Sequence, residues 1–382
     1  MITNKHPTWR RVCRGFVHHT GGTRSGTATR AAAASSVPYG RAVARDWQRA
    51  WQDALYGPEG FFRRGERPSA HFRTAPLVGP EFAEAVLALL DRVDAGLGRP
   101  ERLDFVDVGA GGGELAAAVA DLAPVALRRR LRVVAVEVRP PDEGPAAVDW
   151  RREPPEEVTG LVLGHEWLDA VPCPVVTLHC GQICHVTVDS EGREGVGDPV
   201  SDAHRAWLDR WWPLWTEGQR AEAGVERDAA WADAVRRVRA GAALAVDYGH
   251  RRADRVGGRH RSGTLAAFRG GRSVRPVPDG SRDITAHVAL DACLDAGTRA
   301  GASSGVLVGQ REALAALGLT GTAPPPALAA TDPAGWLAAT ARAGRVAELR
   351  DPTGLGRFGW LLQTTAGARA EELLPGLPPW RP

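Results

Sequence analysis

The amino-acid sequence predicts an α/β fold with a doubly wound, mostly parallel sheet, an N-terminal helical segment and a helical insertion. Two observations support this prediction. Short apolar runs of strand length alternate with helical stretches, which is typical of a parallel sheet with crossover helices. Glycines and acids follow several of these runs, at the strand ends where ligands bind in such sheets. The chain has 382 residues, which allows one large domain with insertions or two domains.

Composition and periodicity divide the chain into six segments. Residues 1–37 lack apolar periodicity and are expected to be disordered. Residues 202–239 are rich in tryptophan, and two helices are predicted there that pack on the sheet or form a cap. The predicted plan is a disordered tail (1–37), a helical segment (38–100), the first part of an α/β core (101–200), a Trp-rich helical insertion (201–240), the second part of the core (241–370) and a loose C-terminal tail (371–382).

The core is organised around residues 103–115, where a strand leads into a glycine turn and then into an Ala-rich helix. The apolar run of the strand carries one acid, Asp107, and the turn contains Gly109, Gly111 and Gly113. Glycine is needed where a backbone turns tightly or approaches a ligand closely. The N-terminus of the following helix offers free N–H groups to a polar ligand.

A second acid, Glu137, follows the next apolar strand at residues 132–136. A carboxylate there can accept hydrogen bonds from both ribose hydroxyls of a nucleotide. The dinucleotide pattern Gly-x-Gly-x-x-Gly is not met, because Glu114 stands after Gly113. The pattern Asp-x-Gly-x-Gly-x-Gly instead resembles the first motif of methyltransferases that use S-adenosylmethionine (SAM). Trp150, in the third strand, is a candidate for stacking on the adenine, with core packing as the alternative.

Charge and composition argue against several classes of protein. Lys and Arg number 48 against 45 Asp and Glu, so the net charge of +3 gives no strong case for a nucleic-acid or membrane partner. Lys5 is the sole lysine, and the heavy use of Arg, Ala, Gly and Pro indicates a GC-rich, bacterial-type genome. Five scattered cysteines and no long apolar run predict a cytoplasmic protein.

Later elements are predicted from apolar runs and capping residues. Strands are predicted at 161–163, 242–246, 306–308 and 359–364, and helices at 80–97, 310–317 and 332–343. Residues 250–282 are predicted to form a long Arg/Gly loop. Asp283 is predicted to cap a helix that opens at Asp-Ile-Thr-Ala-His.

Residues 175–188 are predicted to form a β-hairpin with a type II′ turn at Gly181 and Gln182. The hairpin carries four possible zinc ligands: His179, Cys180, Cys184 and His185. In such a hairpin His179 faces Cys184, whereas Cys180 points to the opposite face because side chains alternate along a strand. Four ligands that converge as zinc requires are therefore hard to arrange, and no metal is predicted.

An ordered set of motifs resembles the MidA family of SAM-dependent methyltransferases, which is related to the mitochondrial complex I assembly methyltransferase. The motifs are Tyr-Gly-Pro-Glu-Gly-Phe-Phe at 56–62, Phe-Arg-Thr-Ala-Pro at 72–76, the turn at 107–113, Glu-Trp-Leu-Asp-Ala-Val-Pro at 166–172, Asp-Tyr-Gly at 247–249, Gly-Thr-Leu at 263–265 and Asp-Ile-Thr-Ala-His at 283–287. The resemblance implies a class I methyltransferase with a Rossmann-like sheet and, from the mitochondrial member, methylation of a protein arginine. This chain has His165 where the family tends to have Asn.

The acids Glu166 and Asp169 follow the fourth strand and are the predicted catalytic pair. Three residues apart on an incipient helical turn, they can face the same side. Carboxylates at this place would bind one face of a guanidinium and orient the attacking nitrogen. Candidates for the substrate cleft are His165, Tyr248 and His287. The predicted cofactor-binding residues are Asp107, Gly109, Gly111, Gly113, Glu137 and Trp150.

Three functions stay open from the sequence. The first is a SAM-dependent transferase that acts on protein arginine, and the second is one that acts on a small molecule, with the Trp-rich helices as a lid. The third is a non-catalytic assembly factor. The intact glycine turn and its two acids favour SAM binding. A protein substrate and a homodimer are the predicted partners, with no nucleic acid and no membrane.

Overall fold

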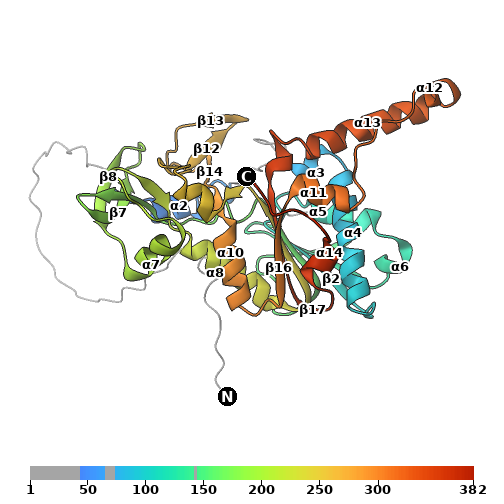
Figure 1. Ribbon diagram of the computed structural model, residues 1–382, viewed down its shortest axis with the longest axis horizontal. Helices are drawn as coiled ribbons and strands as arrows, with labels where there is room; N and C mark the ends of the chain where they lie inside the picture. The colour runs from blue at the N-terminus through green and yellow to red at the C-terminus, as the bar shows by residue number, and fades with distance from the viewer. Residues whose placement is uncertain (1–43, 65–73, 142–143) are drawn as a thin grey trace, which may run out of the picture.

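The computed structural model describes residues 44–64, 74–141 and 144–382. The predicted disordered tail, residues 1–37, lies outside the described residues, as does the start of the motif at 72–76. Figure 1 shows a central sheet covered by helices and, beside it, a smaller region that is rich in short strands.

A seven-stranded sheet forms the centre of the molecule, in the order β16-β17-β10-β5-β2-β3-β4. Its strands are β2 (Leu103–Val108), β3 (Leu131–Val136), β4 (Val148–Arg151), β5 (Val158–His165), β10 (Val238–Asp247), β16 (Ser304–Gly309) and β17 (Gly359–Ala366). The five strands from β10 to β4 run parallel, whereas β17 pairs antiparallel with both β10 and β16. The prediction of a mixed α/β fold with a largely parallel sheet is confirmed.

Helices cover both faces of this sheet because its strands bury side chains on both sides. Along β2, Phe105 packs into one hydrophobic cluster, whereas Val106 and Val108 pack into another. The helices of the first cluster include α4 (Glu81–Gly96), α5 (Glu114–Leu122), α11 (Gln310–Ala316) and α14 (Ala370–Leu373), and those of the second are α8 (Val225–Arg237) and α10 (Leu290–Arg299) (Figure 1). Strands buried on both faces carry near-continuous apolar runs, which made them visible in the sequence.

Further helices lie at the margin of the first face. They are α3 (Ala75–Val78), α6 (Val125–Arg128), α12 (Leu328–Thr331), α13 (Pro333–Leu349) and the 3-10 turn η2 (Leu355–Arg357). Asp332 caps α13 as predicted, because its Oδ1 accepts the backbone N–H of Gly335 at 2.9 Å. Across residues 44–64, 74–141 and 144–382, no helix has both the length and the apolar character needed to cross a membrane.

The smaller region contains two further sheets beside the central one (Figure 1). One is formed by β1 (Arg45–Asp46), β6 (Val175–His179), β7 (Gln182–Val188), β8 (Glu194–Pro199) and β9 (Arg220–Glu222), and the other by β12 (Ala266–Arg269), β13 (Arg272–Val274) and β14 (Asp283–Thr285). The helix α2 (Trp47–Tyr56) packs on β7 and β14, and α7 (Asp202–Trp211) packs on the first of these sheets. The Trp-rich segment contains the two predicted helices with β9 between them: α7 packs in the smaller region, and α8 packs on the central sheet.

Two predictions for the second half of the chain are wrong. Residues 250–282 were predicted to form a loop but contain α9 (Arg252–Val256), β12 and β13. Asp283 does not cap a helix: it begins β14, which pairs with β12, and α10 begins only at Leu290. Because β-branched residues follow Asp283 and β14 is buried against β12, strand pairing outweighs the capping preference of Asp.

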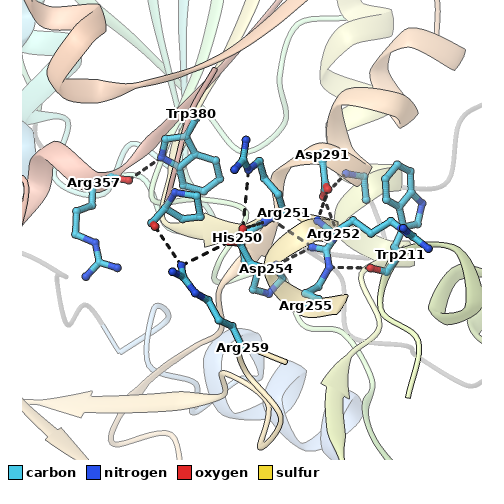
Figure 2. Close-up of polar contacts among 12 residues, drawn as sticks. Trp211, His250, Arg251, Arg252, Asp254, Arg255, Arg259, Asp291, Arg357 and Trp380 are labelled. Atoms are coloured by element: carbon cyan, nitrogen blue, oxygen red, sulfur yellow. Dashed lines mark hydrogen bonds and ion pairs between the residues drawn. The ribbon is translucent and has the colours of Figure 1, made fainter. Parts of the chain in front are cut away.

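The C-terminal tail is packed, contrary to the prediction for residues 371–382. Trp380 is 2% exposed, its backbone N–H donates to the carbonyl of Leu307 at 2.9 Å, and its Nε1 donates to the carbonyl of Arg357 at 2.9 Å. Arg259 donates to the last carbonyl of the tail (Figure 2). Leu373 and Leu374 are also 2% exposed and pack into the first hydrophobic cluster, so the tail is held at both ends without a periodic pattern that the sequence could show.

The short strand β11 (Gly249–His250) pairs with β15 (Val288–Ala289). The arginines that follow β11 join several elements of the fold. Arg255 is buried and donates to Asp291 Oδ1 at 2.8 Å and to the carbonyl of Trp211 at 2.8 Å (Figure 2). It also donates to Nδ1 of the fully buried His250 at 2.7 Å, so that nitrogen carries no proton. This arginine therefore links α9 to α7 and α10.

Candidate functional site

A cavity of about 380 Å³ lies at the C-terminal ends of β2, β3, β5 and β10. This volume falls in the range of small-molecule sites, about 300–1,000 Å³. Its acidic lining residues are Asp107, Glu114, Glu137, Glu166, Asp169 and Asp283. Its aromatic lining residues are Tyr56, Phe62, Trp167, Tyr248, Phe268 and Phe358. Among the described residues of the lining, none is Lys or Arg, so the cavity suits a ligand that carries positive charge.

The glycine turn between β2 and α5 forms one end of the cavity, which we call the cofactor end. Gly109 and Gly111 line it, and Gly113 lies just behind. Gly111 has φ +57°, and a Cβ built on it would meet no atom within 4 Å, so this position leaves open space for a ligand. At Gly113, with φ +80°, a Cβ would lie 2.5 Å from the ring of Trp150.

Glu137 follows β3, and its carboxylate accepts backbone hydrogen bonds, one of them from the glycine turn. Its Oε2 accepts the backbone N–H of Gly111 at 2.9 Å, and its Oε1 accepts that of Val138 at 2.6 Å. A carboxylate oxygen has two acceptor positions, so each retains capacity for a ribose hydroxyl. Glu137 therefore contacts the glycine turn in the structure, and its predicted role as a ribose acceptor stays a prediction.

Asp107 ends β2 beneath this turn and is 3% exposed. Burial, together with the nearby carboxyls of Glu137 and Glu114, raises the pKa of Asp107 to about 7. Burial likewise raises the pKa of Glu137. A cation that entered this end would favour the ionised form of these acids.

Trp150 does not line the cavity. Its ring lies against Gly113 and Gly144 and packs at the edge of the first hydrophobic cluster. This position favours the core-packing alternative over stacking on an adenine.

Three acids from two separate segments form the opposite end, which we call the acceptor end. Glu166 and Asp169 lie in the loop after β5, and Asp283 reaches the cavity from β14 in the smaller region. Each has one buried oxygen without a hydrogen-bond partner among the described residues: Glu166 Oε1, Asp169 Oδ1 and Asp283 Oδ1. The predicted pair is thus brought together with a third acid.

Sequence reasoning missed the role of Asp283. The sequence placed it in a recognised motif, but there Asp283 was predicted to cap a helix. Only the pairing of Asp283 with Phe268, another lining residue, turns its carboxyl toward the cavity.

The three acceptor-end acids influence one another. Burial raises the pKa of Glu166 well above its ordinary value, and Asp169 and Asp283 add to this shift. Burial and the charge of Asp169 raise the pKa of Asp283 to about 8. Burial also raises the pKa of Asp169, while the hydrogen bond from Tyr248 and the positive charge of Arg227 lower it. Like charges that share one buried site disfavour full ionisation until a cation is present.

Backbone hydrogen bonds fix the loop that carries Glu166 and Asp169. Asp247, at the end of β10, accepts the N–H groups of Leu168 at 3.0 Å and Asp169 at 3.2 Å. Glu166 adopts φ +49°, which is uncommon for a residue other than glycine, and donates its N–H to the carbonyl of Val246 at 2.9 Å. Such a conformation, when surrounding contacts determine it, is typical of functional sites.

The three cleft candidates differ in position. Tyr248 lines the cavity, and its hydroxyl donates to Asp169 Oδ2. His165 also lines the cavity, and burial lowers its pKa to about 3, so its ring is neutral. His287 is outside the lining and packs edge-on against Tyr248 at 5.2 Å between ring centroids. Burial, with smaller effects from His260, Arg227 and Arg357, lowers the pKa of His287 to about 4.

The hairpin of β6 and β7 turns one residue earlier than predicted. His179 pairs with Gln182, so Cys180 and Gly181 occupy the turn, both with positive φ, 48° and 74°. His179 therefore does not face Cys184, which pairs with Thr177. The prediction was wrong because it placed glycine first in the turn, whereas here a cysteine takes the uncommon left-handed conformation.

Three exposed residues near this turn could hold a metal ion, namely His179, Cys180 and Glu217. Nδ1 of His179 lies 3.3 Å from Glu217 Oε1, whereas its Nε2 lies 3.6 Å from the sulfur of Cys180. One ligand atom of each residue lies within 4.8 Å of those of the other two, but all three residues are exposed and a closed zinc site needs a fourth ligand. We assign no metal to them, and the absence of zinc stays a prediction.

Comparison with known proteins gives two kinds of match. Residues 83–307 match the model of a family described as "Putative S-adenosyl-L-methionine-dependent methyltransferase". A Burkholderia thailandensis protein crystallised with S-adenosyl-homocysteine is similar in structure, with a TM-score of 0.71 and 25% identity over 87% of this chain and 91% of that one. The native form of an uncharacterized protein from the same organism has a TM-score of 0.72 and 23% identity, with the same coverage. No curated protein matches the sequence.

Proposed function

The chain belongs to this family of S-adenosyl-L-methionine-dependent methyltransferases, and on that premise we propose that its acceptor is the side chain of a protein arginine. One observation carries the proposal: within the part of the chain that the structure describes, three buried carboxyls at the acceptor end each keep an oxygen without a partner, and no Lys or Arg lines the cavity. A guanidinium is always charged and offers five N–H donors in one plane. It can therefore satisfy several of these oxygens at once.

The cofactor end fits SAM. Gly111 leaves open space beside the turn, Glu137 retains acceptor capacity for ribose hydroxyls, and Asp107 and Glu114 offer negative charge to a cationic group. The similar Burkholderia protein binds S-adenosyl-homocysteine, the demethylated product, which supports this placement. When bound, SAM supplies an electrophilic methyl group on a sulfonium sulfur, which keeps the electron pair of the broken bond.

The acceptor-end residues hold the nucleophile and take its proton. Glu166 and Asp283 bind the guanidinium and present one nitrogen to the cofactor end, and such orientation provides most of the gain in a displacement of this kind. The nitrogen loses a proton as it gains the methyl group, and the Asp169 carboxylate is placed to accept it. Tyr248 holds one oxygen of Asp169 and leaves the other free for this exchange.

The proposal also covers the family name, the arrangement of the sheet, the cellular compartment and the oligomeric state. The ordered motifs support the MidA family, and helices on both faces of the sheet support a doubly wound arrangement. The four free cysteines among the described residues suit a reducing, cytoplasmic compartment. A homodimer stays a prediction.

The proposal is tested with peptide pools that carry a fixed central arginine, a fixed central lysine or neither, incubated with methyl-labelled SAM. We expect label in the arginine pool and at least about tenfold less in the lysine pool, because an ammonium cannot pair bidentately with a carboxylate. Asp283→Asn is expected to lower transfer to arginine roughly 10- to 100-fold while SAM affinity changes less than twofold.

The matched control is Asp198→Asn, which removes one carboxylate from the exposed strand β8 and is expected to leave transfer unchanged. Label that enters the lysine pool preferentially would contradict the arginine assignment. Label confined to small molecules of a host lysate, with the arginine pool unlabelled, would favour a small-molecule acceptor instead.

A further inference from the structure

A buried arginine outside the cavity connects the two segments that carry the acceptor-end acids. Arg227 lies on α8 and is 2% exposed. Its Nε donates to the carbonyl of Val171 at 3.0 Å, and its Nη2 donates to that of Asp169 at 2.7 Å. Its Nη1 donates to the carbonyls of Ala286 at 3.0 Å and His287 at 2.8 Å. All three guanidinium nitrogens are therefore used.

These four carbonyls belong to segments that are far apart in the sequence. Two follow Glu166 in the loop after β5, and two follow Asp283 at the end of β14. The segments also meet directly, because the N–H of Ala286 donates to the carbonyl of Asp169 at 3.2 Å. A planar guanidinium holds its donors in a fixed fork, so Arg227 determines how these segments lie relative to each other.

Arg227 is a buried cation whose hydrogen bonds go to carbonyls and, among the described residues, not to a carboxylate. Its charge therefore acts on acids at longer range. It lowers the pKa of Asp169 and of Asp247, against the larger effect of burial, which raises both. The face of the Trp51 ring lies 5.5 Å from the guanidinium carbon and adds a favourable cation–π contact.

The other groups around Asp169 and Arg227 are mostly acidic. Around Asp169 stand Tyr248, which donates to it, and the carboxyls of Glu166, Asp247 and Asp283. Around Arg227 stand Cys173 and Glu222, besides Asp169 and Asp247. Among the described residues, Arg227 is the cation that acts on Asp169 and Asp247, and it does so without touching the cavity, since it is not a lining residue.

We propose that Arg227 is a positioning residue for methyl transfer, which sets the spacing of the acceptor-end acids and places a positive charge behind Asp169. This inference rests on the proposed function, because Asp169 must be ionised to receive a proton from the acceptor nitrogen. The residue acts through Asp169 and the two segments, and not by contact with SAM or the acceptor.

Two substitutions at Arg227 distinguish the effect of its four hydrogen bonds from the effect of its positive charge. Arg227→Lys keeps a cation but cannot reach four carbonyls, whereas Arg227→Met removes both. With the arginine peptides selected above and saturating SAM, we expect kcat to fall about tenfold in the lysine variant and about 100-fold in the methionine variant. SAM affinity by calorimetry is expected to stay within twofold, because Arg227 lies outside the cofactor end.

Arg237 provides the matched control on the same helix. It also donates to two backbone carbonyls, those of Pro154 at 3.2 Å and Pro155 at 3.0 Å, but these lie away from the acceptor end. Arg237→Lys and Arg237→Met are expected to lower thermal stability without changing kcat. A loss of kcat equal to that of the Arg227 variants would show that any lost arginine on α8 has this effect and would overturn the proposal.

The titration of Asp169 gives a readout that does not depend on the acceptor. In protein with ¹³C-labelled aspartate carboxyls, assigned with Asp169→Asn, the midpoint for Asp169 is expected to move to higher pH in Arg227→Met and to stay near the wild-type value in Arg227→Lys. The acidic limb of the kcat profile should move in the same direction. If no arginine peptide is methylated by wild-type protein, the proposed function fails, but this titration still decides the role of Arg227.

Two results would overturn the inference. One is a folded Arg227→Met variant with wild-type kcat and an unmoved Asp169 midpoint. The other is a loss of SAM affinity as large as the loss of kcat, which would make Arg227 a general stabilising residue. If Arg227→Met does not fold, the lysine variant decides: an unchanged kcat in that variant contradicts the positioning role, and a tenfold loss with intact SAM affinity supports it.

Discussion

The two ends of the cavity are built in different ways. The cofactor end comes mainly from one continuous stretch, in which Asp107, the glycine turn and Glu137 follow one another within about one βαβ unit. The acceptor end contains Glu166 and Asp169 from the core and Asp283 from the smaller region. Arg227, outside the cavity, donates hydrogen bonds to backbone carbonyls of both parts. A local motif therefore suffices for the first end, whereas the second exists only in the folded chain.

The largest expected effect tests the cofactor end. Gly111→Val is expected to weaken SAM binding at least about 100-fold in calorimetry, since the side chain would fill the open space at the turn and adopt an unfavourable φ. Gly98→Val is the matched control, because Gly98 also has positive φ, +74°, and no atom within 4 Å of a built Cβ, but it lies outside the cavity. Equal loss of binding in both variants would show that backbone strain alone is responsible.

The next effect separates the two ends. Glu166→Gln keeps size and hydrogen-bonding ability but removes charge, so transfer to arginine is expected to fall roughly 100-fold while SAM affinity stays nearly constant. Kinetics at saturating SAM, together with calorimetry, provide the measurement. If SAM affinity collapsed and turnover per bound SAM were unchanged, Glu166 would belong to the cofactor end.

A smaller effect concerns stability and pH. The pKa of Asp107 is about 7 in the fold against 3.8 ordinarily, so between these values the folded state binds more protons than the unfolded state. Stability without ligand is then highest below pH 4 for this group and falls as the pH rises toward 7. Asp107→Asn removes this loss, so its Tm should exceed that of wild type by an amount that grows from pH 4 to 7, reaching roughly 3 °C. A Tm difference that does not vary with pH, measured by calorimetric scanning, would contradict the assignment.

The smallest effect tests the departure from the family. His165 is neutral and buried, and its ring packs between Phe82 and Phe358, at 5.1 and 6.2 Å between centroids. His165→Asn should therefore change SAM affinity less than twofold and transfer less than about fivefold. A loss as large as that of Glu166→Gln would place His165 among the groups that contact the acceptor.

The sequence predicted what is local and missed what depends on long-range pairing. Residues 105–108 could be recognised because a strand buried on both faces is apolar, here except at Asp107, and the glycines of the turn because a positive φ favours glycine. Asp283 could not, because an Asp before β-branched residues suits both a cap and a strand until β12 pairs with it. The tail buries Leu373, Leu374 and Trp380, but three residues at irregular spacing make no pattern.

The hairpin and Arg227 show two further reasons. The turn prediction failed by one residue because Cys180 accepts a left-handed conformation that statistics assign to glycine. The position of Arg227 could not be predicted, because its partners are backbone carbonyls, which every residue has. No spacing of side chains in the sequence indicates such contacts.

The concentration of acids around one small cavity makes ligand binding a source of protons. Carboxyls such as Asp107 and Asp283, with pKa values of about 7 and 8, are partly protonated at neutral pH and must ionise when positively charged groups arrive. The released protons are taken up by the buffer, so the heat of binding measured in two buffers of different ionisation enthalpy should differ. The slope of heat against ionisation enthalpy would count the protons that each ligand expels.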